Sequence, residues 1–538
     1  MPRAFVSKFP AVLVALKTPF NRRELLATAL ALASCGRTEN TFDGCWLGAS
    51  SARGHRLRAP LPKPGDGPVR KTDVLIVGSG VAGLACAREL NKRGVDFALL
   101  DLEDEAGGNA RSALVGDRAC PLGAHYLPLP GRDAREVYQL LEELGLVHQK
   151  LGRTVWDERY LCHSPQERLF FQGQWVEGLL PPALDAASRI QYIQFAKLVE
   201  SAQRTLGFAM PTRRATWTAA HGALDAQTFA GWLDHQGLTN VQLRWYLDYC
   251  CRDDYGAPAS EVSAWAGLHY FASRHGFHPP GMESAEREAV LTWPEGNAWL
   301  TRHMAEPLRE RLQLGRTVLQ VRPERESVEA LAWNEKADAP ERWSAKRVVL
   351  ATPLFIARRL LTEKIDPLEA VVAQQRHAPW LVANVLLREP LLERPGLPMA
   401  WDNVRYGAET LGYVDAGHQA LRPDRPPLLL THYQALPEKR RAELLSGDWR
   451  AWSGQVLAEL GTLHPDLPGK ASRVELMRWG HGMSIPTPGL RGSVALATLN
   501  ERQGRIAFAH SDLAGYSVFE EAYTAGIAAA LSVAKAAA

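Results

Sequence analysis

One run of residues, 74–83, constrains the fold more than any other part of the chain. Its first four residues are apolar and mostly β-branched and end at a glycine, which is typical of a strand buried on both faces of a parallel sheet. Gly78 permits a tight turn, Gly80 lets main-chain amides approach a diphosphate, and Gly83 lets the following helix pack closely on the strand. The pattern predicts that the phosphates of a dinucleotide lie at the positive end of that helix.

The residues after the turn continue the nucleotide-binding pattern. Leu84, Ala87 and Leu90 recur at helical spacing, and a second apolar strand over residues 97–100 ends at Asp101. A carboxylate at this distance from the glycines accepts hydrogen bonds from the adenosine ribose and repels a 2′-phosphate, which disfavours NADP. The alternative is a structural βαβ unit with an ordinary turn, but the order of strand, helix and terminal acid favours a nucleotide site.

A pair of glycines, Gly107 and Gly108, follows the second strand. With this pair, residues 101–111 resemble the flavin amine oxidase and phytoene desaturase superfamily, in which a di-glycine motif at this place separates FAD enzymes from NAD dehydrogenases. The resemblance implies FAD as the cofactor. The family usually places an arginine directly after the glycines to hold the diphosphate, whereas this chain has Asn109 there and Arg111 two residues later. The phosphate role is therefore carried over to Arg111.

Four later segments also resemble the family. Residues 121–126 match the segment beside the isoalloxazine ring, and residues 317–321 match the strand whose valine meets the adenine. Residues 348–353 match the strand that leaves the nucleotide domain. Residues 504–526 match the closing motif, in which an aspartate, here Asp512, meets the ribityl or diphosphate part and the next helix points its N-terminus at the flavin.

The resemblance implies a non-covalent FAD site, since no cysteine lies near the closing motif. The residues implied as cofactor-binding are Gly78, Ser79, Gly80, Ala82, Gly83, Asp101, Leu102, Gly107, Gly108, Asn109, Arg111, Gly123, Ala124, His125, Val318, Ala351, Asp512, Glu521 and Ala522.

The spacing of these motifs predicts a discontinuous cofactor domain. With 538 residues and 46% hydrophobic content, the chain can fill more than one core. We predict an α/β fold in which a Rossmann-like FAD-binding domain is interleaved with an α+β substrate domain, as in the resembled family. The predicted FAD-binding segments are 71–147, 291–353 and 476–538, and the predicted substrate-domain segments are 148–290 and 354–475.

The N-terminus predicts export. Paired arginines at 22–23 precede a modest apolar run and resemble a twin-arginine signal, and the Leu-Ala-Ser-Cys sequence ending at Cys35 resembles a bacterial lipobox. These resemblances imply a signal over 1–35, a lipidated Cys35, a solvated linker over 36–70, and a periplasmic or membrane-anchored enzyme. The alternative is a start codon assigned too early before an ordinary amphipathic leader. Neither apolar run reaches the roughly 20 residues that cross a bilayer, so we expect a tether and not a membrane-spanning helix.

Charge and cysteine content exclude several other classes of protein. The net charge is +3, which argues against nucleic acid or another polyanion as a partner. The seven cysteines include no C-x-x-C pair and no zinc spacing, so we predict no metal site. A small molecule is the expected substrate.

Two segments supply the candidate catalytic residues. Trp479 precedes the closing motif where the family commonly places an aromatic residue over the flavin, and His481 either moves a proton or hydrogen-bonds the backbone. Trp293 and Glu295 stand where relatives have a turn beside the flavin, and they either face the substrate or begin a helix.

Two further observations bear on the reaction. Asp253 and Asp254 either hold a cationic amine or lie on a solvated loop. The strand expected over residues 380–386 contains no lysine, although amine oxidases of this family generally use one there to promote reaction with oxygen. The electron acceptor is therefore open among a quinone, oxygen and a protein.

The residues and the resemblance together favour an exported, FAD-dependent oxidoreductase of amine oxidase type that moves a hydride from a C–N bond to flavin N5. The first alternative is a desaturase of an apolar isoprenoid or lipid-like substrate, which a membrane tether would suit. The second is a flavin-binding lipoprotein without catalytic activity. A pocket lined by acids and aromatic residues favours the amine, and an aliphatic lining favours the desaturase.

Overall fold

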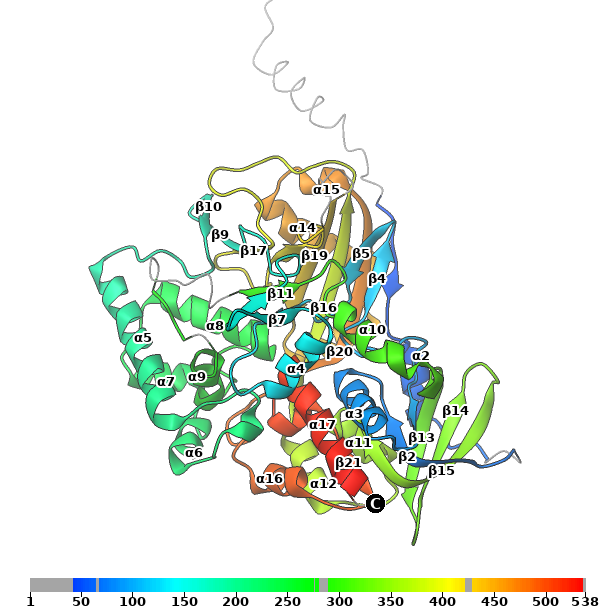
Figure 1. The fold of residues 1–538 in the computed structure, drawn as a ribbon. Helices are drawn as coiled ribbons and strands as arrows, with labels where there is room; N and C mark the ends of the chain where they lie inside the picture. The colour runs from blue at the N-terminus through cyan, green and yellow to red at the C-terminus, as the bar shows by residue number, and fades with distance from the viewer. Residues whose placement is uncertain (1–41, 64–66, 275, 280–288, 421–427, 536–538) are drawn as a thin grey trace, which may run out of the picture. The chain divides into compact units, whose positions relative to one another are not determined.

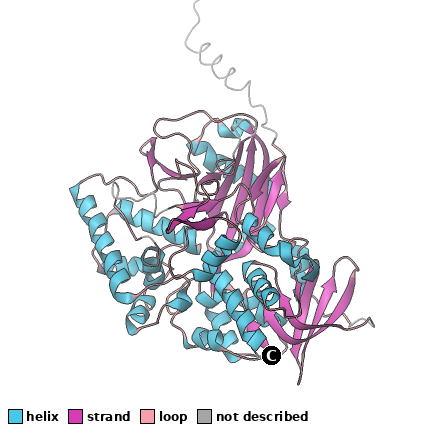
Figure 2. Ribbon diagram, viewed as in Figure 1, coloured by secondary structure: helices cyan, strands magenta, loops and turns pink. Residues whose placement is uncertain are grey.

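The computed structural model describes residues 42–63, 67–274, 276–279, 289–420 and 428–535. The predicted twin-arginine signal, the lipobox and Cys35 lie outside these residues. Two large sheets and the helices on their faces make up most of the described chain (Figure 2).

The first large sheet carries the glycine turn. Its strands come from three separated parts of the chain, as the order β12-β3-β2-β15-β14-β13 shows, with β21 pairing with β15. The strands β2, β3, β12 and β21 run parallel to their neighbours in this sheet, and β13 and β14 extend the sheet as an antiparallel ribbon. The bounds are β2 (Arg70–Val77), β3 (Phe97–Leu100), β12 (Leu312–Gln313), β13 (Arg316–Pro323), β14 (Val328–Asn334), β15 (Ala339–Leu350) and β21 (Ile506–Phe508).

Alternate residues of β2 face two different helical layers. Val74 and Ile76 belong to the core formed with α3, α4, α10 and α17, and Leu75 and Val77 belong to the core formed with α11, α12 and α16. Strand β2 is therefore buried on both faces, as its apolar sequence predicts. The bounds are α3 (Val81–Lys92), α4 (Arg135–Glu143), α10 (Ala298–Ala305), α11 (Leu354–Leu360), α12 (Asp366–Gln374), α16 (Val494–Glu501) and α17 (Phe519–Lys535).

The last helix, α17, packs tightly on α3. A Cβ at Gly526 of α17 would lie 2.1 Å from the carbonyl oxygen of Ala82, so only glycine allows this approach. Figure 1 shows the two helices, red and blue, side by side. The two ends of the nucleotide-binding pattern therefore meet in space.

The second large sheet has the order β1-β20-β16-β19-β18-β17-β9-β10 and is mostly antiparallel. The parallel pairs in it are β1 with β20 and β17 with β9. The bounds are β1 (Trp46–Leu47), β9 (Glu167–Phe171), β10 (Gln174–Glu177), β16 (Arg376–Leu387), β17 (Asp402–Arg405), β18 (Tyr413–Asp415), β19 (Leu428–Ala435) and β20 (Ala471–Ile485).

Two groups of helices cover this sheet. The helices α5 to α9 enclose an aromatic-rich core with it, and α13 to α15 pack with its other residues. Side chains of Asp185, Thr218, Thr228, Asn240 and Ser263 cap the N-termini of the first group. The bounds are α5 (Ala186–Leu206), α6 (Ala219–Asp225), α7 (Phe229–His235), α8 (Val241–Tyr255), α9 (Ala264–Ala272), α13 (Arg441–Ser446), α14 (Trp449–Leu463) and α15 (Leu467–Lys470).

Three short ribbons and several 3-10 turns complete the described elements. The ribbons are β4 (Ser112–Val115) with β5 (Arg118–Pro121), β6 (Tyr126–Pro128) with β11 (Val290–Thr292), and β7 (Val147–Lys150) with β8 (Arg153–Trp156). The 3-10 turns, besides η1 below, are η2 (Thr212–Arg214), η3 (Glu306–Arg311), η4 (Glu438–Arg440) and η5 (Ser511–Ala514). Within the described residues, no helix combines the length and the apolar character needed to cross a membrane.

Part of the predicted solvated linker is ordered and packed. Residues 42–58 contain β1, the short helix α2 (Ser51–His55) and the 3-10 turn η1 (Arg56–Arg58), where the sequence predicted a linker over 36–70. The physical reason is that arginines in this segment pair with carboxylates distant in the sequence, such as Glu335, and a local pattern does not reveal those partners.

Candidate functional site

A cavity of about 930 Å³ contains most of the predicted cofactor residues. This volume is at the upper end of the range of about 300–1,000 Å³ for ligand pockets, as a long dinucleotide requires. The turn between β2 and α3, the loop after β3, strands β16 and β20, and the start of α17 all contribute to its wall. No cysteine is among the described residues that line it.

The glycine turn leaves main chain open to this cavity. Gly78 has φ +101°, and a Cβ there would lie 2.5 Å from the oxygen of Ala351, while a Cβ at Gly83 would lie 1.8 Å from the oxygen of Gly78. At Gly80 the nearest atom to a Cβ is the Cα of Gly108, at 3.9 Å. The space beside Gly80, at the N-terminus of α3, is therefore the place that a diphosphate fits.

Asp101 lines the cavity and also fixes the turn. Its Oδ2 accepts hydrogen bonds from the N–H (2.6 Å) and the hydroxyl (2.7 Å) of Ser79, and its Oδ1 accepts from the N–H of Glu103 (2.8 Å). A carboxylate has about four acceptor positions, so Asp101 keeps capacity for the predicted ribose hydroxyl.

The second glycine pair faces the first turn. A Cβ at Gly108 would lie 3.1 Å from the Cα of Gly80, so the two main chains are in van der Waals contact at this point. Arg111 Nε donates to the carbonyl oxygen of Gly108 (3.0 Å), and its guanidinium lies 3.5 Å from Glu103. Arg111 is 7% exposed and lines the cavity. A buried arginine in the cavity wall beside the two glycine loops suits a phosphate.

Trp479 and the segment 123–125 form the other end of the site. The indole N–H of Trp479 donates to the oxygen of Leu122 (2.7 Å), which holds the ring against this segment. A Cβ at Gly123 would lie 2.2 Å from the oxygen of Asn109, so the segment approaches the di-glycine loop closely. His125 stacks on Tyr433 with ring centroids 4.2 Å apart, and burial lowers the pKa of His125 to about 3. These residues form an aromatic wall for a flat ring system.

Asp512 is buried between two histidines. Its Oδ2 accepts from the N–H of Leu354 (2.9 Å), and its Oδ1 lies 3.2 Å from His377 Nε2 and 3.3 Å from His510 Nδ1. Burial would raise the pKa of Asp512, but the charges of His510 and His377 hold it well below its ordinary value. His481 also lines the cavity, with its ring centroid 6.0 Å from that of His377. Desolvation, followed by the charge of Arg441, lowers the pKa of His481 to about 4.

A cluster of acids lies in the same cavity. Asp253 and Asp254 end helix α8, so the alternative of a solvated loop is wrong. The hydroxyl of Tyr126 donates to Asp253 (3.3 Å), and Arg274 pairs with Asp254 (3.2 Å). Glu520, at the start of α17, also lines the cavity. Burial, and then the charge of Asp254, raises the pKa of Asp253 to about 7.

The cavity brings together most of the predicted residues. Those that line it are Gly78, Gly80, Ala82, Asp101, Leu102, Gly108, Asn109, Arg111, Gly123, Ala124, His125, Ala351, Asp512, Ala522, Trp479 and His481. The predicted residues that do not line it are Ser79, Gly83, Gly107, Val318, Glu521, Trp293 and Glu295.

Three of the residues outside the cavity have other partners. Trp293 is 3% exposed and stacks on Trp299 (5.3 Å), and Glu295 lies 3.7 Å from Arg302. Glu521 accepts from the N–H of Thr212 (2.6 Å) and from a tyrosine hydroxyl, so it points away from the cavity. The structure therefore differs from the expectation that these side chains face the flavin or its substrate.

The sequence reasoning missed several lining residues. Trp380 and Val382 of β16 line the cavity. The alternation of side chains along a strand, which puts these two residues on one face, is the only sequence feature that could have predicted this. Arg274 and Glu520 belong to no sequence motif that predicts a binding site. Residues 49–58 also contribute, although the sequence predicts a linker there.

Comparison with known proteins agrees with this geometry. Residues 81–534 match the family model described as flavin containing amine oxidoreductase. L-amino acid dehydrogenase of Synechocystis sp. is 23% identical over 316 residues, which cover 57% of this chain and 62% of that protein. Amine oxidase B of Homo sapiens is 26% identical over 139 residues, covering 25% of this chain and 24% of that protein. The chain thus spans less than two thirds of these curated relatives.

Among solved structures, a double mutant of putrescine oxidase is similar, with a TM-score of 0.67 and 17% identity. The match covers 87% of this chain and all of that one. The predicted α/β fold class is therefore confirmed.

Proposed function

The chain belongs to the flavin-containing amine oxidoreductase family and is an FAD-dependent oxidoreductase, and from this we propose that it oxidises the C–N bond of a cationic amine. FAD is the predicted cofactor, and the family match confirms a flavin. The prediction that FAD is held non-covalently fits the lack of a cysteine among the described residues that line the cavity. When bound, FAD supplies the two-electron acceptor for the hydride that leaves the carbon beside nitrogen.

The acid cluster carries the proposal of an amine. Three carboxyl groups line the cavity, those of Asp253, Asp254 and Glu520. The buried guanidinium of Arg274 lies among them. Arg274 pairs with Asp254, so the cluster retains two further carboxyl groups. An ammonium group neutralises such a site, whereas an apolar polyene leaves its carboxyl groups desolvated and unpaired. This lining favours an amine over the desaturase substrate.

The chain's own groups are suited to position an amine and handle its proton. An amine enters as a cation and must lose a proton before a hydride can leave the adjacent carbon. Asp253 has a pKa of about 7, raised first by burial, so it exists in both protonation states near neutral pH. Tyr126 orients that carboxyl, and the aromatic wall of Trp479 and Tyr433 keeps water away from the reacting carbon.

We propose further that oxygen is a poor electron acceptor. The residues of β16 that line the cavity are His377, Trp380 and Val382, and no lysine is among the described residues of its wall. Flavin amine oxidases generally have a lysine on this strand to promote reaction with oxygen. The similarity to a protein named L-amino acid dehydrogenase supports a quinone or protein acceptor.

Export and membrane tethering remain part of the proposal. They rest on the twin-arginine and lipobox patterns that end at Cys35. Expression in a bacterial host with the twin-arginine route tests both. The mass of the mature protein should then show a diacylglycerol on Cys35.

Anaerobic reduction of the bound flavin tests the proposed reaction. A monoamine, a diamine, a zwitterionic amino acid and a polyene are mixed separately with the yellow protein, and the loss of flavin absorbance is followed. We expect at least one of the amines to bleach the flavin and the polyene to leave it oxidised. Asp253→Asn should weaken saturation by the amine, while the matched control Asp234→Asn, an exposed residue paired with Arg244, should not. Bleaching by the polyene alone would refute the proposal, and no bleaching by any compound would favour a non-catalytic flavoprotein.

A further inference from the structure

The N-terminal segment 42–58 lies outside the part of the chain that matches the family, which begins at residue 81. Residues 49–58 nevertheless line the cofactor cavity through Ala49, Ser50, Gly54, His55, Leu57 and Arg58, among others. This segment therefore lines the cofactor cavity although none of the sequence motifs includes it.

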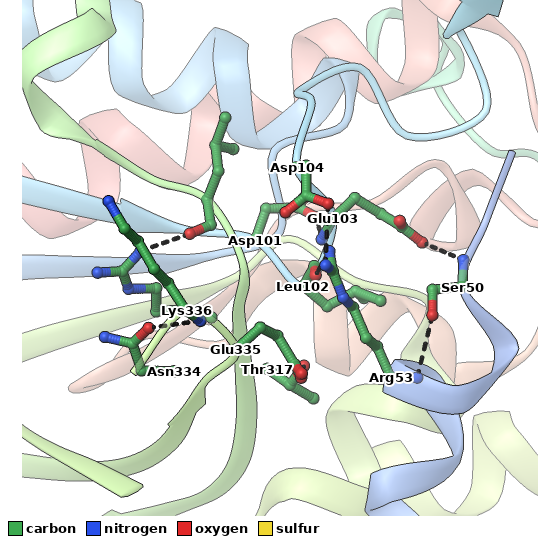
Figure 3. A network of polar contacts seen from close by, with 12 residues as sticks. Ser50, Arg53, Asp101, Leu102, Glu103, Asp104, Thr317, Asn334, Glu335 and Lys336 are labelled. Atoms are coloured by element: carbon green, nitrogen blue, oxygen red, sulfur yellow. Dashed lines mark hydrogen bonds and ion pairs between the residues drawn. The ribbon is translucent and has the colours of Figure 1, made fainter. Parts of the chain in front are cut away.

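Residues 50–53 of the segment are fixed beside the part of the cavity where Asp101 is predicted to bind the adenosine ribose. The N–H of Ser50 donates to Glu103 Oε1 (2.9 Å), and Arg53 donates to the carbonyl oxygen of Leu102 (2.9 Å). The same guanidinium pairs with Asp104 (2.9 Å). Figure 3 shows these contacts beside Asp101, the predicted ribose ligand. The segment thus binds directly to the loop that follows β3.

The next residues bind to the antiparallel part of the same sheet. Arg56 donates from Nε and Nη2 to the two oxygens of Glu335 (3.0 and 3.1 Å), and its guanidinium lies over the ring of Trp333 at 4.7 Å. Arg359 donates twice to the carbonyl oxygen of Leu57 (2.8 and 3.1 Å). A bidentate arginine–carboxylate pair whose guanidinium also stacks on an aromatic ring is stronger than a single surface ion pair.

The start of the segment binds to the other large sheet. Trp46 and Leu47 pair with Leu476 and Met477 of β20, the strand that carries Trp479. The N–H of Cys45 donates to a carboxylate oxygen of Glu475 (2.8 Å). The segment therefore runs from one sheet to the other along the wall of the cofactor cavity.

We propose that residues 49–58 are an additional part of the FAD-binding site and form a strap that slows FAD release. The strap lies against Leu102 and Glu103, next to Asp101, which would hold the adenosine ribose. Arg58 lines the same cavity and has no hydrogen-bond or ion-pair partner among the described residues, so its cation is available to the anionic dinucleotide. Because the strap is fixed on both sheets, FAD cannot leave past it unless contacts such as those of Arg53 and Arg56 break.

The dissociation rate of FAD tests the strap directly. Holoenzyme is diluted into an excess of the apo form of an unrelated flavoprotein oxidase that traps free FAD, and the activity that this trap gains as FAD leaves is followed. We expect release from Arg53→Ala/Arg56→Ala to be about tenfold faster or more, since four donor contacts are lost. The matched control is Arg322→Ala, an exposed arginine on β13 that pairs with Glu324 and Glu329 and does not touch the strap. The control should release FAD at the rate of the natural protein.

A second measurement does not depend on the folding of a variant. Trypsin cleaves after Arg53, Arg56 and Arg58, and cleavage there is compared between holoenzyme and protein from which FAD has been removed. We expect FAD to protect these bonds at least tenfold over cleavage after Lys150, an exposed residue at the turn between β7 and β8. Equal release rates in the variant and the control, or equal cleavage with and without FAD, would overturn the proposal. Neither readout requires a substrate of this protein, so the outcome is independent of whether an amine is oxidised.

Discussion

Replacing Gly80 by alanine separates cofactor binding from folding. Gly80 caps α3 with φ −68° and ψ −175°, a conformation that alanine adopts without strain. The added methyl has no atom closer than the Cα of Gly108, at 3.9 Å. We therefore expect the free energy of unfolding of the FAD-free protein to change by less than about 0.5 kcal/mol.

The same methyl occupies the space where the diphosphate approaches the N-terminus of α3. Moving the phosphates away weakens about two charge-assisted hydrogen bonds, each worth about 1.5–3 kcal/mol. A loss of about 3 kcal/mol corresponds to FAD affinity reduced by about two orders of magnitude. Titration of FAD-free protein by flavin fluorescence measures this loss, and thermal unfolding of the same protein measures its stability.

Two other glycines provide the controls. Gly83→Ala places a Cβ 1.8 Å from the oxygen of Gly78 and should destabilise the protein whether or not FAD is present. Gly454→Ala, in the exposed interior of α14, meets no atom within 4 Å and should leave FAD affinity unchanged while raising stability by about 0.5–1 kcal/mol. If Gly80→Ala binds FAD as tightly as the natural protein, the placement of the diphosphate at this turn is wrong.

Three further predictions concern the reaction, the acceptor and a buried acid. The KM for a cationic amine should fall as the pH rises through about 7, because Asp253 ionises there, and initial rates should show this inflection disappearing in Asp253→Asn. Amine-reduced enzyme should be reoxidised at least about tenfold faster by a soluble quinone than by oxygen in stopped-flow mixing, and Val382→Lys should raise the oxygen rate; a faster natural reaction with oxygen would contradict this. Glu521→Ala should lower stability by about 2 kcal/mol, since the N–H of Thr212 loses its acceptor, while fluorescence titration should give an unchanged FAD affinity.

The nucleotide-binding unit was predictable because its constraints are local. Gly78 is required by its positive φ, Gly83 is required by the carbonyl oxygen of Gly78 in the same turn, and Asp101 follows from the length of one βαβ unit. The positions of Trp293 and Glu295 were not predictable. The local sequence of a helix start is the same whether its side chains face a cavity or a neighbouring tryptophan.

Contacts between distant residues explain most of the other differences. Glu520 and Glu521 are adjacent, and only the rotation of α17 decides that the first lines the cavity and the second binds Thr212. Arg56 binds Glu335, which lies 279 residues away, so the order of the strap has no local signal. Asp253 and Asp254 form a polar cluster only because Tyr126 and Arg274, which come from other parts of the chain, bind them.

The distribution of the first sheet along the chain also limits when the cofactor can be captured. Strand β15 pairs with β2 near the start of the described chain and with β21 near its end, and Asp512 follows β21. A nascent chain in which β21 has not yet been made lacks these elements, and synthesis of the residues between β2 and β21 takes on the order of a minute. Flavin capture must therefore wait for the synthesis of β21 and Asp512, and until then only part of the nucleotide crevice exists.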